Sequence, residues 1–203
     1  VILDAPTADT PAAYAAAADE ILAEYVTDDG LDGLDVDMER SLTAAQVARV
    51  TGVFRALSEH LGPQSGTDRL FIYDTNQEGT HPLTAGIAPY VSYVLVQSYG
   101  RSVSGLQSTW ESYAPYFDAC QYLIGFSFYE ERGQDWGDTT EPFDASRAAQ
   151  YADWQPTGVT KAGIFSYAVD RDGKVPGDDT ITESDFSWST RLIERQDAAA
   201  ASH

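Results

Sequence analysis

Hydrophobic residues along the chain follow two alternating spacings. In some segments they recur every three to four positions, as on one face of an amphipathic helix, and in others they form short dense runs, as in buried strands. The helical spacing predicts helices at residues 12–25, 43–61, 110–117, 145–154 and 184–196. The dense runs predict strands at residues 31–38, 70–74, 93–99, 122–128 and 162–168. Alternation of strands with helices is typical of parallel βαβ units, so the sequence predicts an α/β protein.

The boundaries of these elements carry local signals. Thr10 and Pro11 suit the N-cap and the first position of the first helix, and the Gly62-Pro63 pair suits the end of the second. Residues 1–3 (Val-Ile-Leu) suggest the end of a further strand. The Ala-rich tail at residues 198–203 is interpreted as a linker followed by a tag remnant, which leaves one predicted domain at residues 1–197.

Polar and aromatic residues gather where each predicted strand ends. They are Asp37, Glu39, Asp74, Gln97, Tyr99, Tyr129, Glu130, Glu131, Tyr167 and Asp170. In a (β/α)8 TIM barrel the catalytic residues lie at the C-terminal ends of the strands. The pattern therefore indicates an active site assembled from several strand ends.

The first predicted strand carries closely spaced acidic residues that are candidates for catalysis. In the segment Asp-Gly-Leu-Asp-Val-Asp-Met-Glu at residues 32–39, side chains alternate between two faces, which places Asp35, Asp37 and Glu39 on one face. At about 3.3 Å per residue, Glu39 lies roughly 7 Å further along the strand than Asp37. Carboxylates this close cannot all ionise, so their pKa values separate, which suits a general acid.

A metal site or a serine-type triad is not favoured. The acidic strand and the segment at residues 170–173 (Asp-Arg-Asp-Gly) invite a calcium interpretation, but neither has the EF-hand spacing of acidic residues, Gly and Glu. No G-x-S-x-G motif is present, and His60 and His81 fall on a predicted helix and before a proline. We expect no metal and no cofactor.

The charge and composition of the chain argue against several classes of function. The 203 residues carry a formal charge of −20, which argues against nucleic acid and anionic membrane surfaces as partners. The charge fits a solvated acidic surface, or else a partner with a basic surface. One cysteine excludes an internal disulfide, and no run approaches the ~18–20 apolar residues of a membrane span.

The segment at residues 32–39 matches in full the D-G-x-D-x-D-x-E signature of glycoside hydrolase family 18. The strings Gln-Ser-Tyr-Gly at 97–100, Gly-Phe-Ser-Phe-Tyr-Glu-Glu at 125–131 and Phe-Ser-Tyr-Ala at 165–168 resemble the EndoS branch of that family and its smaller corynebacterial relatives. The resemblance implies a TIM barrel in which the acidic strand is the fourth. The chain would supply about strands 4 to 8, and an N-terminal segment would complete the barrel.

The resemblance also implies a mechanism and its residues. Family 18 enzymes use the 2-acetamido group of the substrate as nucleophile. Glu39 would be the acid and base, Asp37 would orient the acetamido group, and Asp35 would support it. Gln97 and Tyr99 would hold the acetamido carbonyl. The residues expected to contact sugar are Asp74, Tyr129, Glu130, Glu131 and Tyr167, and those considered for stacking are Trp110, Trp136 and Trp154.

The implied function is a secreted endo-β-N-acetylglucosaminidase that cleaves the chitobiose core of N-linked glycans, with immunoglobulin G Fc as the expected glycoprotein. A companion N-terminal fragment of the same barrel is the other expected partner. A chitinase of the same family and a non-catalytic glycan-binding protein are the alternatives. Met38 before the acid argues against a chitinase, and the presence of Glu39 argues against a non-catalytic member.

Overall fold

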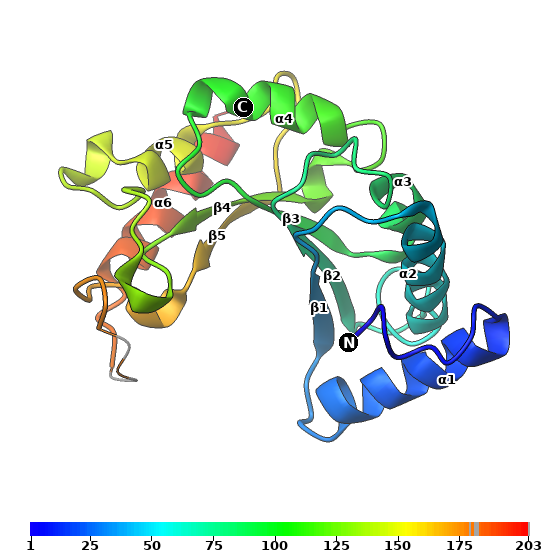
Figure 1. The fold of residues 1–203 in the computed structure, drawn as a ribbon. Helices are drawn as coiled ribbons and strands as arrows, with labels where there is room; N and C mark the ends of the chain where they lie inside the picture. Colours follow the sequence, from blue (N-terminus) through cyan, green and yellow to red (C-terminus); the bar gives the residue numbers. More distant parts are fainter. Residues whose placement is uncertain (179, 181–182, 203) are drawn as a thin grey trace. The chain divides into compact units, whose positions relative to one another are not determined.

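The computed structural model describes residues 1–178, 180 and 183–202. These residues form two compact units, one of residues 1–94 and 112–117, the other of residues 95–111 and 118–203. Five parallel strands follow one another in sheet order as they do in the chain, β1-β2-β3-β4-β5, and helices lie between them (Figure 1). The expected α/β fold is confirmed.

The strands are β1 Gly33–Asp37, β2 Leu70–Thr75, β3 Tyr93–Gln97, β4 Tyr122–Ser127 and β5 Gly163–Tyr167. The helices are α1 Pro11–Leu22, α2 Ala44–Leu57, α3 Thr84–Ile87, α4 Leu106–Tyr113, α5 Arg147–Asp153 and α6 Ser187–Ala201. A π-helical turn, Ala23–Thr27, continues α1. No helix in the described part of the chain is long and apolar enough to cross a membrane.

In the first unit, α1 and α2 lie side by side next to β1 and β2 (Figure 1). The ring of Phe54 on α2 stacks on Phe71 of β2 at 4.7 Å between centroids, so α2 covers the apolar face of the strand. The two helices approach closely where Tyr14 lies over Gly52, since a Cβ at residue 52 would be 2.3 Å from the tyrosine ring. Thr43 begins α2 with a capping box shared with Gln46.

In the second unit, β4 pairs in parallel with β5, and α5 packs against α6. Arg195 of α6 joins Asp153 at 2.6 Å and Asp144 at 2.7 Å, which fixes α6 to the end of α5. Buried Lys161, just before β5, donates to the carbonyl oxygens of Ala152 and Trp154 at the end of α5. Desolvation lowers the pKa of this amine to about 8.

The predicted elements differ from the observed ones at several boundaries. Helix α4 begins at Leu106 rather than residue 110, and α6 begins at Ser187 and continues to Ala201. The short helix α3 was not predicted. Residues 1–3 lie in a turn closed by bonds from the Asp4 and Ala5 amides to the Val1 carbonyl, so their assignment to a strand was wrong. The predicted tag residue His203 lies outside the described residues.

Candidate active site

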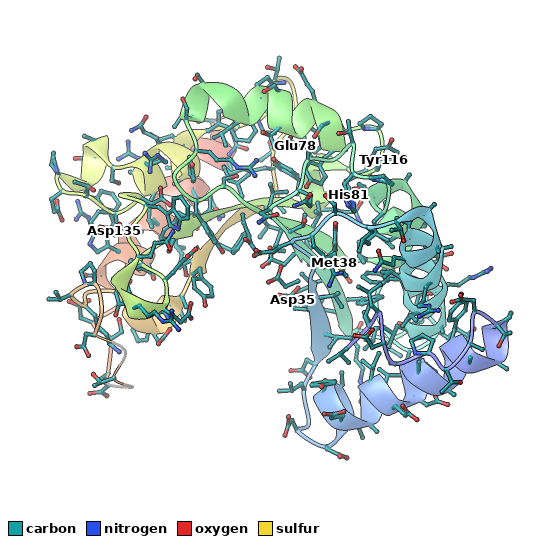
Figure 2. The ribbon with its side chains drawn as sticks, viewed as in Figure 1. Asp35, Met38, Glu78, His81, Tyr116 and Asp135 are labelled. Carbon is teal, nitrogen blue, oxygen red and sulfur yellow. The ribbon has the colours of Figure 1, made fainter. Side chains whose placement is uncertain are left out.

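The acidic strand lies in the first unit as β1 and the two residues after it. Val36 and Met38 are buried, whereas Asp35, Asp37 and Glu39 reach the surface, so the predicted alternation of faces is observed. Figure 2 shows Asp35 and Met38 on this segment. The apolar residues anchor the strand in the core and leave one row of carboxylates exposed.

Glu39 is held by the end of the neighbouring strand. The Asn76 amide donates to Glu39 Oε2 at 3.1 Å, and the Gln77 side chain donates to the Glu39 carbonyl oxygen at 3.2 Å. Buried Thr75 donates from its hydroxyl to the Met38 carbonyl oxygen at 2.7 Å. The Glu39 carboxyl is therefore oriented by a neutral amide, a partner that can hold either its protonated or its ionised form.

Asp74 lies next to Asp37 in the ladder between β1 and β2, whose register pairs these two residues. Residues paired in parallel strands share a face, so Asp35, Asp37 and Asp74 lie on the same side of the sheet. Desolvation by burial raises the pKa of Asp35 above its ordinary value, although the side chain still reaches solvent. The acidic face therefore favours proton retention at Asp35.

A second group of predicted residues lies at the ends of β4 and β5 in the second unit. The Tyr167 hydroxyl donates to Glu131 Oε1, and Arg171 donates to the same oxygen at 3.0 Å. The hydrogen bond from Tyr167, backbone hydrogen bonding and the Arg171 contact together hold the pKa of Glu131 at about 2. Tyr99 stacks on Tyr167 with 6.1 Å between ring centroids. Glu131 is thus a fixed carboxylate beside an aromatic pair.

Tyr129 and Glu130 have different environments although they are adjacent. The Tyr129 ring is 1% exposed and its hydroxyl donates to the Asp178 carbonyl oxygen at 2.7 Å, so it packs rather than facing solvent. The Arg171 guanidinium lies 5.1 Å from its ring centroid. Glu130 is partly exposed, and the Trp136 indole donates to its carboxylate at 3.0 Å.

The structure thus places Asp35, Asp37, Glu39 and Asp74 together in the first unit, and Tyr99, Glu131 and Tyr167 together in the second. Gln97 ends β3, in the second unit. Trp136 is 40% exposed, but Trp110 is 7% exposed and packs edge-on against Tyr122 at 5.0 Å, which places it in the core.

Sequence reasoning missed Asn76 and Arg171, which orient Glu39 and Glu131. Arg171 stood inside the string considered as a calcium loop, and nothing in its spacing indicated its contact with Glu131. In that string, buried Asp172 instead accepts from the Trp188 and Ser189 amides at the start of α6. No group of three or more His, Cys, Asp or Glu side chains within residues 1–178, 180 and 183–202 could hold a metal ion.

Two curated relatives are similar to most of this chain. Endo-β-N-acetylglucosaminidase F2 of Elizabethkingia meningoseptica is 40% identical over 187 residues, which cover 89% of this chain and 56% of the relative. Endo-β-N-acetylglucosaminidase EndoS of Streptococcus pyogenes serotype M1 is 38% identical over 236 residues, covering 90% of this chain and 24% of EndoS. The chain thus spans about half or less of the length of these relatives.

A solved endo-β-N-acetylglucosaminidase from Cordyceps militaris superposes with a TM-score of 0.90 at 55% identity, covering 96% of this chain and 66% of that one. A variant of that enzyme, in complex with fucosyl-N-acetylglucosamine-Asn, superposes equally well at 54% identity. Residues 1–166 match the family model of the endo-β-N-acetylglucosaminidase EndoS TIM-barrel domain. The chain therefore belongs to the EndoS TIM-barrel family of endo-β-N-acetylglucosaminidases.

Proposed function

We propose that this protein is a glycoside hydrolase family 18 endo-β-N-acetylglucosaminidase that cleaves the β-1,4 bond of the chitobiose core in N-linked glycans. The observation that carries the proposal is the row Asp35, Asp37 and Glu39 on the exposed face of β1, with Glu39 oriented by Asn76. The relatives are endo-β-N-acetylglucosaminidases by name. The fungal variant bound to fucosyl-N-acetylglucosamine-Asn has an Asp and a Glu, two positions apart, changed to Asn and Gln. Asp37 and Glu39 have the same spacing.

In the proposed mechanism the substrate supplies the nucleophile. Glu39 donates its proton to the glycosidic oxygen while the acetamido oxygen attacks C1, and the bond from C1 to the leaving oxygen breaks. Asp37 orients the acetamido group and offsets the positive charge of the oxazolinium ion, with Asp35 behind it. Glu39 then accepts a proton from water, whose oxygen bonds to C1 and restores the acetamido group. The product retains its configuration.

The remaining predicted residues are proposed to bind substrate. Gln97 and Tyr99 would hold the acetamido carbonyl, as the resemblance implies. Glu130, Glu131 and Asp74 offer carboxylate oxygens that can accept from sugar hydroxyls, and Tyr167 offers a ring beside Tyr99. Because Tyr129 is buried, we assign it a supporting role beneath Arg171 rather than a direct contact.

We further propose immunoglobulin G Fc as the glycoprotein and secretion as the route to it, in line with the EndoS resemblance. β1 is the first strand in the sheet order. A groove at this strand is lined by residues 1–4 and by Leu34 to Met38. We propose that further barrel strands, on a preceding segment or a separate companion fragment, pair with this strand. Full activity from a soluble monomer of residues 1–203, without a companion on a denaturing gel, would exclude the separate fragment.

The test of the reaction is mass measurement after incubation with intact antibody and, separately, with chitin oligomers. We expect the antibody heavy chain to lose its glycan except for one N-acetylglucosamine, and chitin oligomers to remain intact. Glu39→Gln should abolish the reaction, whereas Glu59→Gln, an exposed glutamate after α2, should not change it. Cleavage of chitin alone would assign a chitinase, and cleavage of neither substrate would refute the proposal.

A further inference from the structure

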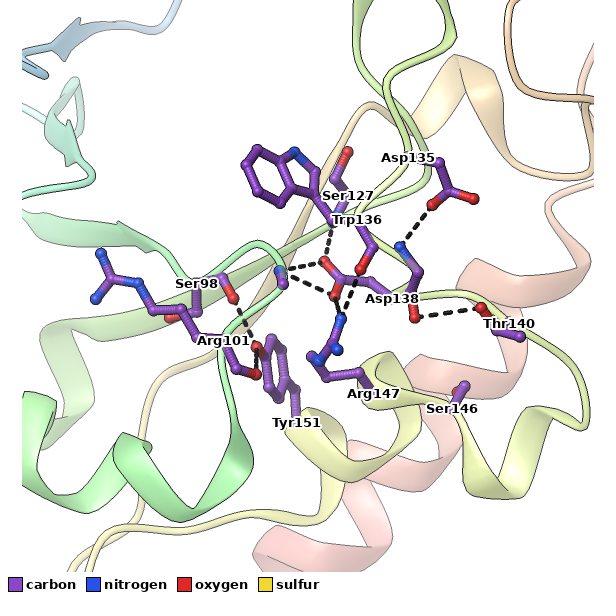
Figure 3. Close-up of polar contacts among 12 residues, drawn as sticks. Ser98, Arg101, Ser127, Asp135, Trp136, Asp138, Thr140, Ser146, Arg147 and Tyr151 are labelled. Atoms are coloured by element: carbon purple, nitrogen blue, oxygen red, sulfur yellow. Dashed lines mark hydrogen bonds and ion pairs between the residues drawn. The ribbon is translucent and has the colours of Figure 1, made fainter.

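Asp138 is a carboxylate with no exposed surface in the second unit, outside the residues assigned to catalysis or sugar contact. Its oxygens accept from the Gly100 amide at 3.1 and 3.3 Å and from the Ser127 amide at 3.0 Å. Arg147 completes the environment through an ion pair with Asp138 Oδ1 (Figure 3). One buried carboxylate thus joins the turn after β3 to the last residue of β4.

The turn that Asp138 holds is the one that carries Tyr99. The Arg101 amide donates to the Ser98 carbonyl oxygen at 2.9 Å, which closes a four-residue turn with Gly100 at its third position and at φ 68°. On the other side, the buried Tyr151 hydroxyl lies 2.6 Å from the Ser98 carbonyl oxygen and 2.7 Å from that of Arg101 (Figure 3). The Tyr99 backbone is therefore fixed from both sides.

The same network continues to Glu130. Arg147 also donates to the Trp136 carbonyl oxygen at 2.8 Å, and the Trp136 indole donates to Glu130 Oε1 at 3.0 Å. The Trp136 ring lies directly against Gly100, where a Cβ would be 2.9 Å from a ring carbon. A residue larger than glycine at position 100 would displace the tryptophan that orients Glu130.

We infer that Asp138 is a positioning residue, which with Arg147 and Trp136 sets the placement of both Tyr99 and Glu130 for substrate. The inference rests on the proposed function, in which these two residues hold the substrate. It extends that function to Asp138 and Arg147, which make no proposed contact with sugar, and to Trp136, which was considered above only for stacking on sugar.

The chemistry of Asp138 explains why a carboxylate is needed at this position. A buried charge is tolerated when it is paired and fully hydrogen-bonded, and Asp138 has two backbone amides and one guanidinium. An asparagine has one oxygen in place of two acceptors, so either the Ser127 amide on Oδ2 or the Arg147 guanidinium on Oδ1 would lose its partner, and the Gly100 amide would keep only a neutral acceptor. Arg147 would also lose its counter-charge.

The experiment compares Asp138→Asn and Trp136→Phe with a matched control, Lys161→Met, in the full protein. Lys161 is also a buried charge that binds backbone groups, but it precedes β5, at the opposite end of that strand from Tyr167. All three variants are assayed well below their unfolding temperatures, with the folded fraction measured by circular dichroism.

The activity readout separates positioning from loss of fold. We expect Asp138→Asn to lower kcat/KM by about 10- to 100-fold in the folded protein, because small displacements of positioned groups have effects of this size. Trp136→Phe keeps the ring against Gly100 but removes the donor to Glu130, so we expect KM to rise with kcat nearly unchanged. Lys161→Met should retain both parameters after correction for folded fraction.

A second readout does not depend on activity. The indole N–H signal of Trp136, one of four tryptophan signals, is assigned in a ¹⁵N spectrum by its loss in Trp136→Phe. We expect Asp138→Asn to shift this signal and to speed amide exchange at Gly100, and Lys161→Met to change neither. If the spectrum responds but wild-type protein cleaves no glycan, the proposed function fails and the network stands. Unchanged Trp136 and Gly100 signals in folded Asp138→Asn, or unchanged kcat/KM in an active enzyme, would overturn the inference.

Discussion

Two groups of carboxylates in this molecule show opposite environments. At β1 in the first unit, desolvation raises the pKa of Asp35, and the Glu39 carboxyl is held by the neutral Asn76 amide. At the ends of β4 and β5 in the second unit, Tyr167 and Arg171 hold the pKa of Glu131 at about 2. Burial thus raises the pKa of one carboxyl, that of Asp35 in the first unit, whereas hydrogen bonds and a cation lower the pKa of another, that of Glu131 in the second.

The difference in pKa shifts is consistent with different roles for the β1 carboxylates and Glu131. A general acid must gain and lose a proton near the working pH, which requires partners that tolerate both forms. A group that only accepts hydrogen bonds from sugar hydroxyls works best as a permanent carboxylate, and the lowered pKa of Glu131 favours its ionised form. This contrast fits the proposed function, in which Glu39 after β1 would transfer protons and Glu131 with its neighbours would hold substrate.

The largest expected effect comes from changing one glutamate in each group. Glu39→Gln should lower kcat by about 10²- to 10⁴-fold, the usual contribution of a general acid or base. Glu131→Gln should lower kcat/KM by no more than about tenfold, as expected for one hydrogen-bonding partner. The measurement is steady-state glycan release, with Glu59→Gln as the control. Equal losses of kcat/KM in both variants would contradict different roles for Glu39 and Glu131.

A smaller effect concerns what keeps Glu131 ionised. Its hydrogen bond from Tyr167 is the largest cause of the low pKa, ahead of backbone hydrogen bonding and of Arg171. We expect Tyr167→Phe to raise the Glu131 pKa from about 2 toward 4.5, and by more than Arg171→Met does. Titration of the Glu131 carboxyl carbon by NMR checks the order. A larger rise in Arg171→Met would show that charge, rather than the phenol, dominates this site.

The smallest expected effect is on stability. The contributions of Glu131 and Asp35 to stability change with pH in opposite directions. Glu131 has a lowered pKa when folded, so its stabilisation is present above about pH 4.5 and is lost as the pH falls toward 2. Asp35 has a raised pKa, so its contribution to stability declines as the pH rises through values above 3.8. Both side chains reach solvent, which reduces both effects.

Denaturant unfolding between pH 2 and 7 measures these slopes. We expect Glu131→Gln to remove part of the acid-side loss of stability, and Asp35→Asn to remove part of the decline toward neutral pH. Wild-type protein and Glu59→Gln should show both slopes. A variant of Asp35 that steepens the decline toward neutral pH would mean that its carboxylate is stabilised in the fold, contrary to the burial that raises its pKa.

The sequence predicted the fold and the acidic strand because both depend on local spacing. Alternation along β1 places Val36 and Met38 inside and the carboxylates outside, whatever packs around them. The five strands were recognisable for the same reason. Helix α6 was placed too early because residue 184 precedes it, and the helix begins at Ser187, where distant Asp172 accepts from the Trp188 and Ser189 amides. No local pattern contains that contact.

The supporting residues could not be predicted because their partners are distant in the sequence. Asp138 follows a Trp-Gly pair in a polar loop, which suggests a solvated charge, but it is buried and binds Gly100, 38 residues away. Tyr129 was expected to contact sugar from the family resemblance, and its ring is buried beside the Arg171 guanidinium. Burial of a polar residue depends on which loops fold over it, and only the tertiary structure shows this.

The close approach of α1 and α2 has a consequence for sequence variation in the family. The Tyr14 ring occupies the space that any side chain at residue 52 would need, since a Cβ there would lie 2.3 Å from the ring. Changes at these two positions should not be independent. Relatives with a larger residue in place of Gly52 should carry a smaller one in place of Tyr14, so the two positions should covary when many members of the family are aligned.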